Sequence, residues 1–230
     1  MYYCFCLIVD LFIIYSFIGY LIEVTSCSFT EKKLNFSRGY FVGPYLPIFG
    51  VGSMIFANFF QKYKGDFFAL FIIGLFSACI LEYITSYLLE KIFKLRWWDY
   101  SSRKFNLNGR ISLETGIGFG ILGVLIVRYI HPFLLHFLLG LSDTTIFISG
   151  TILFIIFFVD FVFSTYTISR LKIDISKYKS KDSTSYVRGE VFDSLKKSSI
   201  FYSRLFKSFP NFSKNVGIDK IRVFFDQKKD

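Results

Sequence analysis

The residues of this chain that could do chemistry are carboxylates set inside long apolar stretches. Glu82 and Glu90 lie in one such stretch, with Ser86 midway between them. Residues four apart share one face of a helix, so these three side chains would form a single polar stripe. An acid near the centre of a membrane-spanning helix costs roughly 3 kcal/mol on insertion scales, so it requires a reason. Such acids can bind a cation, relay a proton, or act as an acid–base pair.

Other apolar stretches also hold acids, inside them or at their ends: Asp10, Glu23, Glu114 and Asp160. Together with the Glu82 stripe, these acids can direct polar groups at one space in the cytoplasmic half of a helix bundle. Simpler interpretations stay open. Glu23 and Glu90 can be interfacial charges in water, and Glu114 can be a first-turn carboxylate favoured by the helix dipole. Asp10 and Asp160 can be satisfied structural acids.

Familiar motifs for other chemistries are absent from the sequence. It has no phosphate-binding Gly-Lys-Ser/Thr loop, no GxSxG and no HExxH. The two histidines, His131 and His136, flank Pro132 at a spacing that does not favour a shared metal site. The four cysteines form no CxxC pair, so neither a zinc site nor a disulfide framework is expected. We therefore predict no cofactor and no metal.

The composition is that of a membrane protein. The 230 residues are 53% hydrophobic and include 32 Phe and 15 Tyr, which lipid tolerates better than water does. The formal net charge is +10. Because the basic residues lie between and after the apolar runs, we expect them to face anionic lipid headgroups rather than nucleic acid.

Five stretches are long and apolar enough to be considered as spanning helices. The second contains several Gly and Pro residues in its first half. It is either a broken, partly re-entrant helix, whose freed backbone groups need protein partners, or an interfacial loop leading into a shorter helix. A further run, Phe133–Leu141, is expected to lie at the interface. The five predicted spans are Tyr2–Val24, Tyr40–Phe60, Phe67–Leu89, Ile111–Ile130 and Thr144–Ile168.

The distribution of Lys and Arg predicts the orientation of these spans. With the C-terminal tail inside, 24 of the 27 basic residues fall on the cytoplasmic side. The N-terminus is then outside. The basic connector between the third and fourth spans is cytoplasmic, and its Trp97, Trp98 and Tyr100 are typical of an aromatic belt at the headgroups. We expect Arg38 and Arg110 to lie at the mouth of the polar space and neutralise two of the acids.

The chain divides into a transmembrane domain, 1–168, and a basic cytoplasmic tail, 169–230. Within the tail, Ser194–Phe209 mixes basic and aromatic residues and can form an amphipathic helix on anionic lipid. The alternative is a loosely ordered, solvated tail.

Several motifs, in this order, are similar to those of a known family: Tyr15–Glu23, Arg38–Gly50, Leu81–Tyr83, Trp97–Ser101 and Phe105–Ile111. Together they resemble the putative ABC-transporter type IV permease family of bacterial membrane proteins, over about residues 5–168. The resemblance implies a permease subunit that works with a separate ATPase. Because five spans make a small permease, we also expect a homo- or hetero-oligomer. The predicted substrate-binding residues are Glu23, Arg38, Glu82, Trp98, Asp99, Asn106, Asn108, Arg110 and Glu114.

The sequence thus predicts an all-α, polytopic membrane protein with a carboxylate-lined pocket open to the cytoplasm. The leading function is a transporter permease or solute-binding component, in which Glu82 anchors a cationic group or a proton. Arg38 and Arg110 would gate or pair it, and Trp98 with Asp99 would shape the entrance. The alternatives are an intramembrane enzyme acting on lipid headgroups and a membrane scaffold or assembly protein.

Overall fold

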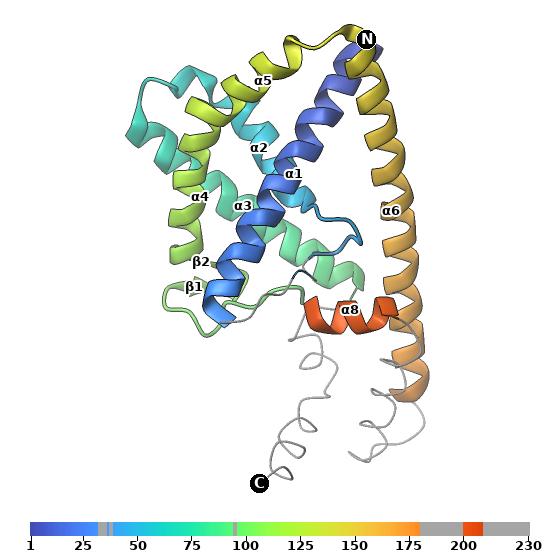
Figure 1. Cartoon of the computed structure of the whole chain (residues 1–230). Helices are drawn as coiled ribbons and strands as arrows, with labels where there is room; N and C mark the ends of the chain where they lie inside the picture. Colours follow the sequence, from blue (N-terminus) through green and yellow to red (C-terminus); the bar gives the residue numbers. More distant parts are fainter. Residues whose placement is uncertain (32–35, 37–38, 94–95, 180–199, 209–230) are drawn as a thin grey trace.

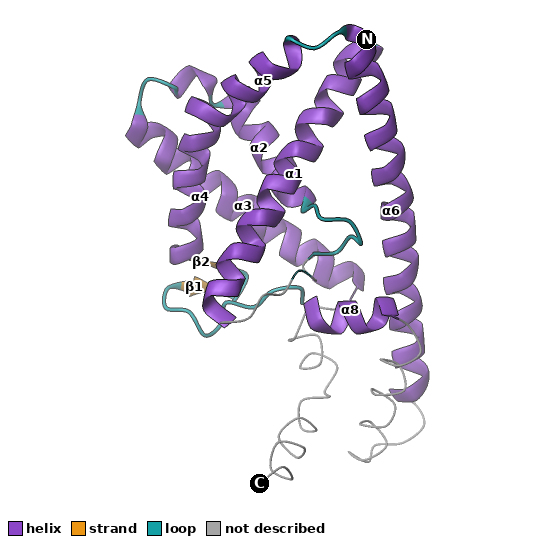
Figure 2. Ribbon diagram, in the orientation of Figure 1, coloured by secondary structure: helices purple, strands orange, loops and turns teal. Residues whose placement is uncertain are grey.

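The computed structural model describes residues 1–31, 36, 39–93, 96–179 and 200–208, and this part of the chain is almost entirely helical (Figures 1 and 2). In this part of the chain, one two-stranded hairpin precedes the helix that begins at Leu113. The elements in chain order are α1 (Tyr2–Glu31), α2 (Pro47–Phe59), η1 (Gln61–Tyr63), α3 (Phe67–Phe93), β1 (Asn106–Leu107), β2 (Ile111–Ser112), α4 (Leu113–Leu125), η2 (Ile126–Ile130), α5 (His131–Leu139), α6 (Asp143–Lys179) and α8 (Ile200–Ser208).

Four helical stretches within the described residues are long and apolar enough to cross a membrane: Tyr2–Ser28, Phe67–Phe93, Leu113–Leu139 and Asp143–Leu171. A fifth apolar helix, α2, is shorter. The predicted all-α, polytopic bundle is therefore confirmed. The N-terminus and the turn between α5 and α6 lie at one end of the bundle, whereas the hairpin and α8 lie at the other (Figure 1). We call the second of these the connector end.

The fourth span differs from the prediction. We expected it to stop at Ile130 and Phe133–Leu141 to lie separately at the interface, but α4, η2 and α5 form one continuous 27-residue stretch. The π-helical segment η2 makes this possible, and the His131 N–H reaches back to the Ile126 carbonyl. A proline lacks an N–H and crowds the preceding turn. Because a π-helical turn is wider, Pro132 is accommodated without ending the helix.

The second span is a loop followed by a 13-residue helix. Residues 39–46 run into the space between α1 and α6 (Figure 1), and Pro47 then begins α2. The loop's backbone is satisfied by protein, as a break within the bundle requires. Asp160 of α6 accepts hydrogen bonds from the N–H groups of Val42 (3.0 Å) and Gly43 (2.7 Å). It also accepts the hydroxyls of Tyr45 (2.5 Å) and Ser164 (2.7 Å), so it is a satisfied structural acid.

Small residues bring α3 and α4 together, as the Gly116-x-x-x-Gly120 spacing suggests. A Cβ added to Gly74 of α3 would lie 3.6 Å from the Gly120 backbone. One added to Gly120 would lie 2.8 Å from the ring of Phe71, closer than a Cβ can approach. This close contact holds the first half of α3, which precedes the acidic stripe, against α4.

Part of the tail packs on the bundle. Helix α8 covers the later part of the predicted amphipathic segment Ser194–Phe209, whose other residues lie outside the described part. Leu205 is 2% exposed and packs in a cluster with Phe93, Trp97, Ile168 and Leu171. Arg204 donates hydrogen bonds to the carbonyls of Gly39 and Phe41. Helix α8 therefore contacts the same loop that Asp160 holds from α6.

We predict that Asp160→Asn loosens this loop. An amide has one acceptor oxygen in place of two and cannot satisfy the same four donors, which should cost about 2 kcal/mol or more. The thermal unfolding midpoint of the purified protein should fall, and chymotrypsin should cleave faster at Tyr40–Tyr45. The matched control is Asp143→Asn, at an exposed aspartate in the first turn of α6. Equal midpoints and cleavage rates in both variants would contradict the prediction.

Candidate functional site

The most deeply buried acid at the connector end is Glu82, in the middle of α3. Its side chain is 4% exposed. One carboxylate oxygen, Oε1, accepts a hydrogen bond from the hydroxyl of Tyr100 at 3.0 Å. Within the described residues, the other oxygen, Oε2, is buried without a hydrogen-bond partner. A buried carboxylate with one donor is strongly underpaired, so this position favours a bound proton or cation.

A second acid lies beside Glu82. The pKa of Tyr100 is raised above its ordinary value by burial first, and then by the negative charges of Glu82 and Glu23. Both carboxylates therefore lie near the Tyr100 hydroxyl, one from α1 and one from α3. Glu23 also accepts a weak hydrogen bond from the Cys27 thiol at 3.3 Å. The prediction that α1 and α3 direct acids at a common space agrees with this arrangement.

Arg110 does not pair with Glu82. Its guanidinium instead reaches Glu90, with Nη2 2.7 Å from Oε2, and donates to the Ser86 hydroxyl at 3.2 Å. The rings of Tyr83 and Tyr87 flank it at 5.7 and 5.6 Å. Arg110 therefore contacts the stripe of α3 one and two turns beyond Glu82, at Ser86 and Glu90. From there it does not directly neutralise the charges of Glu82 and Glu23.

Asp99, which was predicted to shape the entrance, makes its contacts within the connector. Its Oδ1 accepts the backbone N–H of Ser101 at 3.0 Å and its hydroxyl at 2.5 Å, and lies 3.4 Å from Arg96. Burial raises the pKa of Asp99, but these hydrogen bonds and the Arg96 charge outweigh it and hold the pKa below its usual range. Asp99 is thus an internal brace of the turn that leads into Tyr100.

The hairpin contains the remaining polar residues of the predicted site. Asn106 accepts the Gly109 N–H at 3.0 Å and donates to the Arg103 carbonyl, and Asn108 donates to the Tyr83 hydroxyl at 3.0 Å. Asn106 therefore folds the connector, and Asn108 attaches it to α3. The indole N–H of Trp98 donates to the Arg110 carbonyl at 2.9 Å, which joins the two ends of the connector.

Two predicted site residues remain, Glu114 and Arg38. Glu114 is largely exposed in the first turn of α4 and pairs with Arg103, in agreement with the simpler interpretation of a first-turn carboxylate. Arg38 lies outside the described residues.

Two of the three connector aromatics that were expected in a belt at the headgroups, Trp97 and Tyr100, contact the protein interior. Trp97 is 6% exposed and packs in the cluster that holds Leu205. Tyr100 turns its hydroxyl inward to Glu82. This second contact is the site feature that sequence reasoning missed. No local spacing could indicate it, because the two residues are 18 positions apart and meet only after the connector folds back on α3.

Another buried acid lies toward the opposite end of the bundle. Asp10 is 2% exposed, and its Oδ2 accepts the Ser149 hydroxyl at 2.8 Å. Its Oδ1 has no hydrogen-bond partner among the described residues. Nearby, the Tyr15 hydroxyl lies 2.8 Å from Nδ1 of His131. Asp10 thus joins α1 to α6, as a structural acid would, and lies far from the Glu82 cluster.

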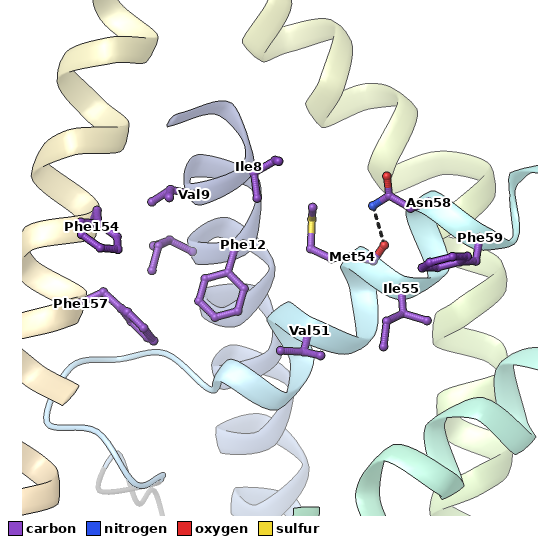
Figure 3. A pocket seen from close by; sticks show the side chains of 11 residues that line it. Ile8, Val9, Phe12, Val51, Met54, Ile55, Asn58, Phe59, Phe154 and Phe157 are labelled. Carbon is purple, nitrogen blue, oxygen red and sulfur yellow. Dashed lines mark hydrogen bonds between the residues drawn. The ribbon is translucent and has the colours of Figure 1, made fainter. Parts of the chain in front are cut away.

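The structure also has an apolar groove of about 610 Å³ between α1, α2 and α6 (Figure 3). Phe12, Val51, Met54 and Phe154 are among its lining residues. Asn58 brings an amide to its rim, but that amide is engaged with the Met54 carbonyl at 2.7 Å. This groove contains none of the acids, so we place the candidate site at Glu82 instead.

No group of three or more His, Cys, Asp or Glu side chains in the described ranges is arranged to hold a metal ion. The chemistry that the Glu82 cluster offers is therefore that of two neighbouring carboxylates with a phenol. Such a set can take up and release a proton, or hold one cationic group.

These features define a multi-pass α-helical membrane protein with an acidic site at one end of the bundle. Residues 10–165, about two thirds of the chain, match the model of a family described as putative ABC-transporter type IV, and the chain belongs to that family. The resemblance suggested by the sequence motifs is thereby confirmed. No curated protein and no solved structure matches the chain.

We predict that Gly109→Ala destabilises the connector. Gly109 has φ = +65°, and a Cβ there would lie 2.4 Å from the Ser101 hydroxyl and 2.5 Å from Asp99. The expected cost is about 1–3 kcal/mol, measured as a lower thermal unfolding midpoint in detergent. Gly118→Ala is the control, since a Cβ at Gly118 has open space and alanine favours a helix. A midpoint for Gly109→Ala as high as for Gly118→Ala would contradict the prediction.

The depressed pKa of Asp99 predicts a pH-dependent contribution to stability. Its stabilisation is fully present above the unfolded value of about pH 4 and is lost as the pH falls through the lower folded pKa. The gap in unfolding midpoint between wild type and Asp99→Asn should thus be constant near neutral pH and narrow in acid. A gap that is independent of pH would show that the Asp99 charge contributes nothing.

Proposed function

We propose that this chain is the membrane-spanning subunit of an ABC-type transporter, and that Glu82 anchors a cationic group or a proton within it. One observation carries the proposal: Glu82 is almost fully buried, has one hydrogen-bond donor among the described residues, and lies near a second acid. The nearby Arg110 is engaged with Glu90. A buried anion without a cation is costly, so a positive species has a place to bind.

The orientation in this proposal follows from charge. The basic connector and tail face the cytoplasm, and the N-terminus lies outside. The Glu82 site then opens toward the cytoplasm, on the side where a separate ATPase subunit would bind. Basic residues of the tail contact anionic headgroups there. Five apolar helices offer little room for a complete pathway, so the working unit is a homo- or hetero-oligomer.

The intramembrane enzyme is the second candidate, and it uses the same two acids. Glu82 and Glu23 would act as a proton donor and acceptor toward a lipid headgroup. In the scaffold alternative, by contrast, Glu82→Gln has no effect, whereas loss of the tail does.

The test is to purify wild type and Glu82→Gln from native membranes in mild detergent and to identify by mass spectrometry what co-purifies. We expect an ATPase subunit with the wild type, and a cationic small molecule that is lost in Glu82→Gln but kept in Asp143→Asn. If a proton is the bound species, both proteins retain the ATPase, and ATP-driven proton movement in vesicles is lost in Glu82→Gln alone.

A wild-type protein that carries neither an ATPase nor a small molecule would contradict the transporter proposal. It would make the enzyme the leading function. Retention of every ligand and of full transport in Glu82→Gln would remove Glu82 from the site.

A further inference from the structure

Glu82 belongs to the apolar helix α3, whereas Tyr100, which contacts it, does not. The tyrosine belongs to the connector, between α3 and α4, and its hydroxyl lies 3.0 Å from Oε1 of Glu82. The connector runs along the end of the bundle at which the hairpin and α8 lie (Figure 1), so Tyr100 approaches Glu82 from the connector end. The hydroxyl donates its hydrogen to this carboxylate, because an ionised carboxylate can only accept.

The backbone of Tyr100 is fixed on both sides. Its N–H donates to the Gly109 carbonyl at 2.8 Å, and its carbonyl accepts the Arg103 N–H at 2.8 Å. The preceding residue, Asp99, is braced by Ser101 and Arg96. Gly109 packs so closely on this brace that no side chain fits there. The folded connector as a whole therefore holds Tyr100 where its hydroxyl reaches Glu82.

The connector is attached to α3 at two further points. Asn108 donates to Tyr83, and Arg110 pairs with Glu90. All of these attachments lie on the cytoplasmic side of Glu82 in the proposed orientation. Movement of the connector away from α3 would take Tyr100 with it and leave Glu82 open to water.

We propose that Tyr100 is the cover and positioning residue of the Glu82 site: it closes the carboxylate from the connector end, and its withdrawal with the connector opens the site. The role of this opening in transport rests on the proposed function. The covering of Glu82 by Tyr100 does not. A proton or cationic group that enters from this end must pass Tyr100 to reach the second carboxylate oxygen of Glu82, Oε2, which has no hydrogen-bond partner among the described residues. Tyr100 thus controls both the access to Glu82 and the position of the Glu82 carboxylate.

The experiment measures how easily a water-soluble carbodiimide, with an amine as nucleophile, modifies Glu82 in nanodiscs. Peptide mass spectrometry reads the modification, normalised to the exposed Asp143. The variants are Tyr100→Phe, which keeps the ring and removes the hydroxyl, and Tyr100→Ala, which removes both. We expect modification to rise roughly fivefold in Tyr100→Phe, as for the loss of one hydrogen bond, and by well over tenfold in Tyr100→Ala.

A second variant leaves Tyr100 in place. Gly109→Ala disturbs the turn that holds the tyrosine, so Glu82 modification should rise there too, while Gly118→Ala should match wild type. Repeating the labelling over a range of pH separates exposure from a change in protonation, because exposure raises the rate at every pH.

Equal modification in wild type and Tyr100→Ala would overturn the inference. An equal rise in Tyr100→Phe and Tyr100→Ala would also overturn it, because the ring would then cover nothing. The proposed function fails separately: if Glu82→Gln keeps every ligand and all transport while Tyr100→Ala still exposes Glu82, the cover stands without a transport role.

Discussion

The burial of the Glu82 carboxylate is the constraint on which the rest of the site depends. A charged group with one hydrogen-bond donor cannot be left in an apolar bundle without a compensating proton or cation. The surrounding structure is arranged around that demand. Tyr100 supplies the one donor, Glu23 adds a second acid, and Arg110 is held by Glu90 and the tyrosine rings. The site is consequently acidic and can receive a positive species.

The acids in the apolar helices fall into different physical states, and this separates structure from function. Asp160 has four donors and holds the loop of the broken second span. Glu90 has an arginine, and Glu114 has one at the surface. Glu82 and Asp10 each have a buried oxygen without a partner among the described residues. Of these two, Glu82 has a second acid near it and receives its hydrogen bond from the connector, so function is best sought there.

Sequence reasoning predicted much of the architecture because hydrophobic length and periodicity are local properties. The apolar runs gave the long helices, and the Gly and Pro residues of 39–50 marked the break in the second span. The fourth span was placed too short, because the prediction ended it at Ile130 and set Phe133–Leu141 apart at the interface. The π-helical turn that accommodates Pro132 depends on hydrogen bonds that composition does not reveal.

The sequence by itself determined that this is a polytopic helical membrane protein of its family, that acids lie within its helices, and that Glu82, Ser86 and Glu90 share a face. Helical periodicity and the cost of charge in lipid suffice for these conclusions. Only the tertiary structure decided which partner each acid receives. Arg110 went to Glu90 and Tyr100 to Glu82, because the path of the connector over α3 sets which side chains meet. Contacts between residues distant in the chain depend on that path, and no spacing in the sequence encodes it.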